Sequence, residues 1–233
     1  MRRVQFWAFA PLTLLATFSS TSWVVASTNL NYTPAELSPK TTILLAQADN
    51  LGQAVLDEIN QVRSNPSAYA DLIERTRNSI RTQEGSSVID ETIQFLRLTP
   101  PKPPLTSSRG LTQAARDHVN DQRPKGSIGH DGSDGSNPGT RINRYGSFQT
   151  TWGENISYGM NKARSVVMQL LIDDGVPSRG HRKSIVDPDY RVAGVACGSH
   201  ARYRTMCVID YAGGYTERDS KSSNLGGYLA KWE

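Results

Sequence analysis

The sequence predicts an α+β fold in which helices fill the first half of the chain and a small, mostly antiparallel sheet comes late. Apolar residues recur at helical spacing over 51–62 and again over 166–171. Two short runs that are typical of strands, 192–197 and 206–211, follow the last helical pattern and are close enough in sequence to form a hairpin. Strands and helices do not alternate, so a parallel sheet built from βαβ units is not expected.

Length and composition exclude several classes of protein. The chain has 233 residues, of which 37% are hydrophobic and 8% aromatic, enough for one domain with a core and too few for a protein with many membrane spans. Lysine and arginine number 26 against 22 acidic residues, a net charge of +4. This excess is small and evenly spread, so nucleic acid is not an expected partner.

The N-terminus has the features of a secretory signal peptide. Arg2 and Arg3 precede a largely apolar stretch over 4–18, and Val24-Val25-Ala26 places small residues before a cleavage point after Ala26. We therefore expect residues 1–26 to be a signal peptide and the product to be secreted or periplasmic.

The alternative interpretation of this segment is an uncleaved membrane anchor. Pro11 and the Ser/Thr-rich residues 17–22 interrupt the apolar run before it reaches the roughly 20 residues that a span needs. No membrane span is therefore expected after signal removal. A second apolar stretch ending in Ala46-Gln47-Ala48 offers a later cleavage point near Ala48.

The remaining chain divides by composition into three parts. Residues 27–48 contain two prolines and scattered Ser and Thr and are interpreted as a linker. The folded domain is expected over 49–215. Residues 216–233 are polar and are expected to form a C-terminal tail.

The first helices follow from their start and stop signals. One helix is expected to begin after Asp49-Asn50. Asn65-Pro66 ends it and starts the next helix, with Asn65 as N-cap and Pro66 as the first residue. A third helix over 89–96 is stopped by the proline-rich 99–104, which is expected to be a stiff polyproline connector.

The middle of the chain is expected to be a helix, a long loop and a short helix. Ser107 or Ser108 caps the helix that carries the apolar positions of 111–119. The glycine-rich 129–139 is then a loop, and a short helix follows over 140–145.

The two cysteines of the sequence lie in the two predicted strands of the hairpin. If the hairpin turns near Arg202, Cys197 faces Cys207 and Val195 faces Ile209. Cysteines that face each other on paired strands are close enough to form a disulfide, and an exported protein retains such a bond. Two reduced, buried thiols are the alternative.

Three segments combine ligand-type side chains with neighbouring glycines: 129–135, 153–156 and 179–182. They supply His130, Glu154 and His181, and two imidazoles with one carboxylate suit Zn²⁺ or a similar cation with one position left open. Their spacing matches no compact zinc motif. Three separately hydrogen-bonded polar groups are therefore the alternative to one shared site.

Other candidates for chemistry have simpler interpretations. His118 lies beside two alanines on a predicted helix and is expected to be a packed histidine, while His200 falls in the hairpin turn and is expected to be exposed. No G-x-S-x-G sequence is present, so a serine hydrolase of that type is not expected.

The stretch from about residue 50 to 215 resembles the CAP superfamily, also called the SCP domain, and is most similar to its short bacterial members. That superfamily includes the cysteine-rich secretory proteins, the venom antigen-five proteins and the plant pathogenesis-related proteins of group one. Five short motifs in the family's order carry the resemblance: Leu56 to Asn60, Gly129 to Gly135, Gly153 to Ile156, Gly180 to Ile185 and Gly194 to Cys197.

The resemblance implies an α-β-α sandwich, with the sheet between helical layers and a cleft lined by two histidines and two acidic residues. By position, His130, Glu154 and His181 match three of these four. The family often has a Glu on the helix before the second histidine, and this chain has none there. Asp173 or Asp174 is then the fourth residue, or the site has three ligands. Zn²⁺ or another divalent ion is the implied cofactor.

The leading functional hypothesis is a secreted binding or interaction module without catalysis. Its cleft would hold a divalent ion, and an extracellular ligand such as a lipid or a sterol is a candidate partner by analogy with relatives. The alternative is a metal-dependent extracytoplasmic peptidase or esterase, in which His130 and His181 hold the metal and Glu154 is the general base. A third hypothesis is a purely structural domain whose motifs stabilise loops.

Overall fold

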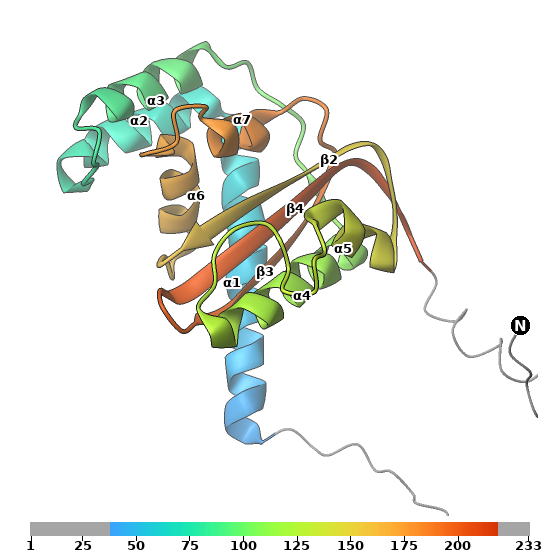
Figure 1. The fold of residues 1–233 in the computed structure, drawn as a ribbon. Coiled ribbons are helices and arrows are strands. Elements are labelled where there is room, and N and C mark those ends of the chain that lie inside the picture. Colours follow the sequence, from blue (N-terminus) through green and yellow to red (C-terminus); the bar gives the residue numbers. More distant parts are fainter. Residues whose placement is uncertain (1–37, 219–233) are drawn as a thin grey trace, which may run out of the picture. The chain divides into compact units, whose positions relative to one another are not determined.

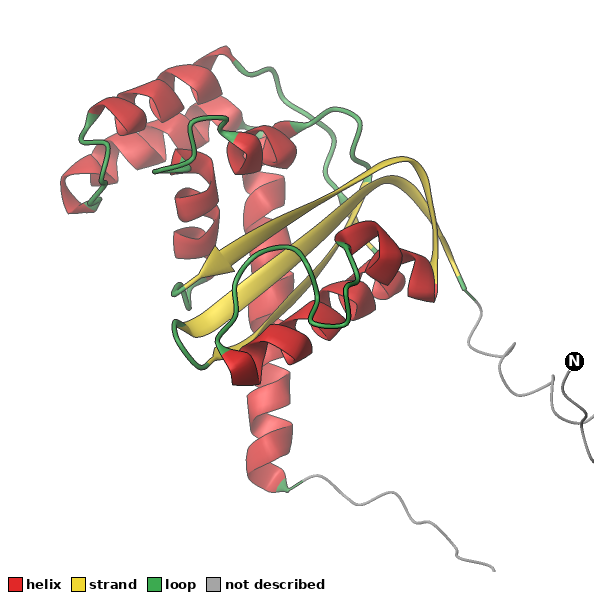
Figure 2. Ribbon diagram, in the orientation of Figure 1, coloured by secondary structure: helices red, strands yellow, loops and turns green. Residues whose placement is uncertain are grey.

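The structure is a computed structural model that describes residues 38–218, and it confirms the predicted α+β class (Figures 1 and 2). The helices are α1 (Pro39–Ser64), α2 (Pro66–Thr76), the 3₁₀ helix η1 (Arg77–Ser79), α3 (Ser87–Leu98), α4 (Arg109–Lys125), α5 (Pro138–Tyr145), α6 (Ala163–Ile172) and α7 (Gly180–Val186). The strands are β1 (Thr106–Ser107), β2 (Gly146–Tyr158), β3 (Val192–His200) and β4 (Arg204–Glu217).

The four strands form one sheet in the order β1-β3-β4-β2. The short strand β1 pairs with β3 in parallel, and the other pairs are antiparallel. An irregularity in the pairing of β2 with β4 lies between Gln149 and Trp152. In this sheet β2 is an edge strand, and α5 on one side and α6 and α7 on the other pack against it.

The sheet lies between two helical layers, as the α-β-α prediction requires. In Figure 1, α1 crosses behind the sheet while α4 and α5 cross in front of it. Because successive strand residues point to opposite faces, Val195, Cys207 and Ile209 join the core beneath α1, α3 and α6, while Ala196 and Val208 pack with Ala115 and Val119 of α4.

The predicted hairpin is confirmed residue by residue. Cys197 pairs with Cys207 and Val195 with Ile209, and the two cysteines form a disulfide. Alternation of apolar residues in both strands was sufficient to set this register, because a slip by one residue would turn the core side chains toward the opposite face.

The predicted caps are also confirmed. The side chain of Asn65 accepts a hydrogen bond from the N–H of Ala68 at 3.1 Å, and Ser108, one of two serines considered, accepts from Leu111 at 3.2 Å. Each satisfies an N–H at the start of its helix that has no partner within that helix.

Both ends of the folded part differ from the prediction. The first helix begins at Pro39 and not after Asn50, because Ser38 caps it through the N–H of Thr41; the last ten residues of the predicted linker are therefore helical. At the other end β4 continues to Glu217, whose carboxylate accepts from Ser108 Oγ and from the N–H of Gly110, so residues predicted as tail close the sheet.

Four elements were not expected from the sequence: η1, β1, β2 and α7. The predicted signal peptide 1–26 and the cleavage point after Ala26 lie outside the described residues, whereas the alternative cleavage point near Ala48 lies within α1. Among the helices described between residues 38 and 218, none has the length and apolar character needed to cross a membrane.

Candidate functional site

The first of two histidine–carboxylate pairs joins His130 to Glu154. His130 lies in the loop between α4 and α5, and its Nδ1 lies 2.7 Å from Glu154 Oε1 on β2. The second carboxylate oxygen of Glu154 accepts from Arg141 of α5 at 2.7 Å. The side chains of Glu154 and Arg141 are each 1% exposed whereas that of His130 is 50% exposed, so the imidazole covers a buried ion pair.

These contacts shift the pKa values of both members of the pair. The hydrogen bond to Glu154 raises the pKa of His130 above its usual value, against the effect of burial. Burial alone would raise the pKa of Glu154, but the hydrogen bond from His130 and the charge of Arg141 outweigh it, and that pKa lies below its usual value. Glu154 is therefore an ionised carboxylate with both oxygens engaged.

Two further titratable groups lie beneath this pair. Asp210 of β4 is directly opposite Glu154 in the sheet and is fully buried; neither carboxyl oxygen has a hydrogen-bond partner among the residues described. Burial raises the pKa of Asp210 well above its usual value, and the nearby charge of Glu154 raises it further. His118 of α4 is also buried, which lowers its pKa, and its Nε2 contacts the carbonyl of Gly129 at 2.8 Å.

The second pair joins His181 to Asp173. The imidazole Nδ1 of His181, near the start of α7, lies 2.6 Å from Asp173 Oδ1 at the end of α6. The other oxygen of Asp173 accepts from the backbone N–H of His181 at 2.9 Å. Asp173 has a left-handed backbone conformation, φ 55°, and this C-cap geometry turns its side chain toward α7.

The two acidic candidates next to α6 have different contacts. Asp174 accepts hydrogen bonds from the backbone N–H groups of Gln83 and Glu84 and so ties the loop after η1 to the end of α6. Of the two candidates for the fourth position, Asp173 is therefore the one that contacts a histidine, whereas Asp174 binds the backbone of the loop after η1.

The edge strand β2 lies between the two pairs. Glu154 faces α4 and α5, whereas the next residue, Asn155, faces the other layer, where its amide donates to the carbonyl of His181 at 3.1 Å and to Tyr211 Oη at 3.3 Å. The motif from Gly153 to Ile156 therefore serves both pairs through neighbouring residues. Within residues 38–218 no hydrogen bond joins one pair to the other, and no three His, Cys, Asp or Glu side chains form a group that could hold a metal ion.

The orientation of the two imidazoles, His130 and His181, nevertheless suits the binding of a divalent cation. Histidines that bind metals usually have one ring nitrogen at a carboxylate or carbonyl, which fixes the other nitrogen as the ligand. His130 and His181 each have Nδ1 at a carboxylate, and Nε2 is the atom left for a ligand. Both oxygens of Glu154 and of Asp173 are engaged in hydrogen bonds, so only the two imidazoles offer donors. Metal binding stays a prediction.

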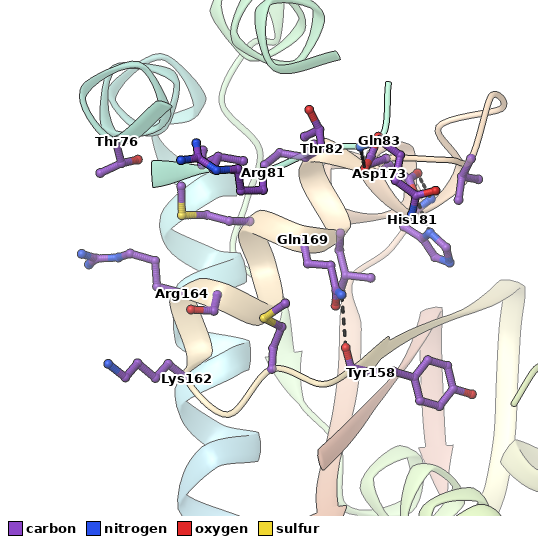
Figure 3. Close-up of a pocket in the computed structure, with 18 of the residues that line it drawn as sticks. Thr76, Arg81, Thr82, Gln83, Tyr158, Lys162, Arg164, Gln169, Asp173 and His181 are labelled. Atoms are coloured by element: carbon purple, nitrogen blue, oxygen red, sulfur yellow. Dashed lines mark hydrogen bonds and ion pairs between the residues drawn. The ribbon is translucent and has the colours of Figure 1, made fainter. Parts of the chain in front are cut away.

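A groove follows α6 and reaches His181 (Figure 3). We call it the α6 groove; it has a volume of about 880 Å³ and is lined by α6, the loop after η1, and the end of β2. Its apolar lining includes Ile80, Ile156, Met160, Met168, Ile172 and Val176. Tyr158, Gln169, Asp173 and His181 line it as well, while His130 and Glu154 do not.

The other two histidines also have defined places. His118 is packed in the core, as expected. His200 is 2% exposed rather than exposed, because its Nε2 contacts the carbonyl of Ser127 and its ring packs against Tyr158 and Tyr203; the prediction for His200 was wrong.

Sequence reasoning missed several residues that shape the site. Arg141 and Asp210 lie in segments with no glycine-flanked motif, and only their positions on a helix facing the sheet and on a strand opposite Glu154 show their importance. Arg182, within the motif of His181, is a structural residue: it is buried and donates to the carbonyls of Leu171 and Ile172.

Several solved structures are similar to this chain in part of its length. Solved structures that match include an extracellular protein containing an SCP domain from Bacillus anthracis (21% identity over 55% of this chain and 39% of that one, TM-score 0.39). An outer surface protein of Borrelia burgdorferi matches at 19% identity over 60% of this chain and 97% of that one, with a TM-score of 0.40. A cysteine-rich secretory protein of Staphylococcus aureus matches at 15% identity over 55% and 37%, with a TM-score of 0.35.

Two of these structures are much longer than the region they share with this chain, which spans 39% and 37% of their lengths. The search among curated proteins finds no match. The profile of the cysteine-rich secretory protein family, CAP, matches residues 56–211, which is more than half of the chain and contains both histidine–carboxylate pairs and the disulfide. The protein belongs to the CAP family.

Proposed function

We propose that this protein is an exported binding module and that the α6 groove is its ligand site. The observation that carries the proposal is the groove itself, about 880 Å³ in volume, with a largely apolar lining and a few polar groups at its ends. Binding sites for small molecules typically have this size and composition. An amphiphilic molecule with an apolar chain is the ligand class that such a lining accepts.

Export is supported by the sequence of the first 26 residues and by the disulfide. A positive start, an apolar stretch and a small-residue cleavage point are the parts of a secretory signal. The bond between Cys197 and Cys207 is of the kind that forms outside the reducing cytoplasm.

The contacts of the two histidines favour binding over catalysis. Nucleophilic catalysis needs a hydroxyl or thiol within hydrogen-bond reach of a base. Across residues 38–218, no such group forms a hydrogen bond with the imidazole of His130 or His181. In the alternative, a metal-dependent hydrolase, Glu154 would act as base, but both of its oxygens are engaged by His130 and Arg141.

A divalent ion is the second part of the proposal and rests on the resemblance to relatives. It would be held by Nε2 of His130 and of His181, and it would supply a Lewis-acidic centre beside the groove. Titration of Zn²⁺ into the metal-stripped chain by calorimetry tests this: binding should be stoichiometric and should be lost in a His130→Ala/His181→Ala variant. Binding that is unchanged in that variant would refute a shared ion.

The groove is tested by filling it. We expect the purified chain to bind radiolabelled dodecanoate, and Met168→Trp to weaken binding by about tenfold or more, because a large ring would occupy the lining. Leu98→Trp is the matched control, since Leu98 is 77% exposed and does not line the groove. Equal binding by all three proteins would place the ligand elsewhere and overturn the proposal.

A further inference from the structure

We propose that the connector between α3 and β1 is a docking site for a protein domain with an aromatic-lined groove, of the kind with which SH3 domains bind polyproline II helices. The observation that carries the inference is a row of four exposed prolines, Pro100, Pro101, Pro103 and Pro104, which we call the proline ridge. The proline ridge does not line the α6 groove, so this inference is independent of the proposed function.

The sequence of the connector confines it to an extended conformation. Each proline fixes its own φ at about −65°, and each residue that precedes a proline is restricted to extended or polyproline II geometry. This second restriction applies to Thr99, Pro100, Lys102 and Pro103, and Thr99 has φ −80° and ψ 122°. Figure 1 shows the connector as an extended segment that leaves the end of α3. A polyproline II helix, with three residues per turn, is the regular structure that satisfies these restrictions.

The exposure of the connector repeats every three residues, as a polyproline II helix requires. Thr99 and Lys102 are half-buried and Leu105 is buried, so one edge of the helix faces the protein. The proline ridge occupies the other two edges as two exposed pairs, 100–101 and 103–104, which lie one turn apart, about 9 Å. Both edges have the P-x-x-P spacing that aromatic-lined grooves recognise. The two edges that such a groove would contact are therefore the two that the protein leaves free.

Hydrogen bonds from α1 hold the inner edge of the connector in place. The N–H of Lys102 donates to the carbonyl of Arg63 at 2.7 Å, and Arg63 Nε donates to the carbonyl of Pro103 at 2.9 Å. The amide of Asn60 donates to the carbonyl of Leu105 at 3.0 Å and accepts from its N–H at 2.7 Å. Arg63 is fully buried. A partner would therefore bind a preformed segment and lose little conformational entropy in ordering it.

The rings of the proline ridge do not contribute to the core. Of the hydrophobic clusters in residues 38–218, none includes any of the four prolines. Leu98, which precedes the ridge by two residues, is 77% exposed and is the most exposed large apolar side chain in the described part of the chain. Leu98 and the proline ridge thus form an apolar surface along one short segment. Exposed apolar surface of this kind on a folded protein marks a site of interaction.

The charge of the connector favours a groove bordered by carboxylates. Lys102 is its only charged residue and forms no ion pair with the residues described between 38 and 218. By contrast, Arg97 at the end of α3 pairs with Asp71 and Glu74. The flexible side chain of lysine can reach the border of a groove that holds the ridge. A second copy of this chain that docked its own ridge here would bring like charges together, so a different protein with an acidic border is the better partner.

The inference is tested by titrating the purified chain into ¹⁵N-labelled SH3 domains and recording NMR spectra of the domains. The probes are three SH3 domains that bind P-x-x-P peptides and differ in the flanking residues that they prefer. We expect saturable shifts in at least one of them, confined to the residues of its aromatic groove. The same domain with its groove tryptophan replaced by alanine should not bind. Absence of saturable binding to all three domains, or equal binding to the domain without the tryptophan, would overturn the inference.

Variants of the chain locate the contact. Pro101→Ala/Pro104→Ala removes the rings from one edge of the ridge and should weaken binding by about tenfold or more. Leu98→Asp, at an exposed position that can change without affecting the core, should also weaken binding. Pro124→Ala/Pro177→Ala is the matched control, because it removes two exposed prolines outside the ridge, and it should bind as the wild type does. Circular dichroism confirms that each variant is folded.

The remaining outcomes also decide the question. Binding that is unchanged in both ridge variants would show that the SH3 domain contacts another surface, and equal weakening in the control would show a general effect of removing prolines; either result would overturn the inference. Self-association of the chain that the ridge variants abolish would show that a second copy covers the ridge, which would also overturn it. Binding of dodecanoate should be unchanged in the ridge variants, because the ridge does not line the α6 groove.

Discussion

At the scale of single residues, the site depends on a buried carboxyl group that the motifs do not contain. Asp210 lies opposite Glu154 on the neighbouring strand, and both side chains are nearly or fully buried. Two ionised carboxylates at directly opposed positions of neighbouring strands would repel each other strongly, because the dielectric constant is low where they are buried. Because Arg141 and His130 hold Glu154 in its ionised form, Asp210 is the member of the pair that keeps its proton.

This assignment predicts the effect of Asp210→Asn on stability. Burial, followed by the charge of Glu154, raises the folded-state pKa of Asp210, so above pH 4 the folded state binds more protons here than the unfolded state does. The stability that this group contributes is present at low pH and is lost as the pH rises through the folded-state pKa. The neutral amide removes this dependence and can donate to Glu154.

We therefore expect Asp210→Asn to be more stable than the wild type by about 1–3 kcal/mol at pH 8, with a smaller difference at pH 4. Urea unfolding at both pH values measures this. Asp189→Asn, at an exposed position, is the control and should change little. A variant that is destabilised equally at both pH values would contradict the proton assignment.

At the scale of elements, close packing of α4 on the sheet positions the His118 and His130 side of the site. A Cβ at Gly194 of β3 would lie 2.1 Å from the backbone nitrogen of Thr112 and 2.3 Å from the carbonyl carbon of Leu111. Glycine is therefore needed at this position for the approach of a helix backbone, which explains its place in the last of the five motifs.

Gly194→Ala should move α4 away from β3 and destabilise the protein by about 1–3 kcal/mol, because backbone cannot yield as a side chain does. Gly180 of α7 is the matched control: a Cβ there would meet only Ser178 Oγ, at 3.5 Å. Gly180→Ala should leave the free energy of unfolding within about 0.5 kcal/mol of the wild type. Equal effects of the two substitutions in thermal or urea unfolding would refute the packing argument.

The elements that the sequence predicted well are those with local signals. Asn65-Pro66 and Ser108 give helix starts through their own side chains, and alternation of apolar residues gives the register of the hairpin around Cys197. The strand β2 has no such signal, because it is an edge strand with polar residues on both faces, including Glu154 and Asn155.

The start of α1 and the end of β4 were missed for a related reason. Residues 40–43, 46 and 47 are exposed, so no buried stripe marks this stretch as helix, and the local signals for its start are the cap by Ser38 and a proline, Pro39, at the first helical position. The last residues of β4 are held by hydrogen bonds that the Glu217 carboxylate accepts from Ser108 and Gly110, which are distant in sequence. Neither contact can be inferred from neighbouring residues.

At the scale of the whole molecule, one covalent bond supports the sheet on which both histidine–carboxylate pairs depend. The disulfide joins β3 to β4 across a separation of ten residues, and β4 in turn pairs with β2, which carries Glu154 and Asn155. A loop of this length contributes about 2–3 kcal/mol to stability through the entropy of the unfolded chain.

Cys197→Ala/Cys207→Ala should therefore lower the free energy of unfolding by about 2–3 kcal/mol and keep the fold, because the register of the hairpin is also set by its apolar side chains. Circular dichroism during urea unfolding measures both properties. The wild type under a strong reductant should resemble the variant. Complete loss of structure in both would show that the hairpin register depends on the disulfide alone.

The candidate site could be predicted only in part. The motifs identified His130, Glu154 and His181, and family resemblance suggested the fourth acidic position, where Asp173 lies against His181. Whether His130 and His181 bind one shared ion depends on the distance between the two imidazoles on either side of β2. The spacing of the residues in the sequence does not give that distance. The α6 groove could not be predicted at all, because its lining comes from three segments with no common pattern.

The most direct test of the ligand site uses the methionine methyl groups. Of the four methionines, Met160 and Met168 line the α6 groove, Met206 is fully buried and packs with Val208 on the α4 side of the sheet, and Met1 lies outside the described residues. In ¹³C-methyl NMR of the chain titrated with dodecanoate, the account predicts that the signals of Met160 and Met168 shift with the same dissociation constant while that of Met206 stays in place. Saturable binding of dodecanoate that leaves Met160 and Met168 unshifted would contradict the account, because the ligand would then occupy another surface.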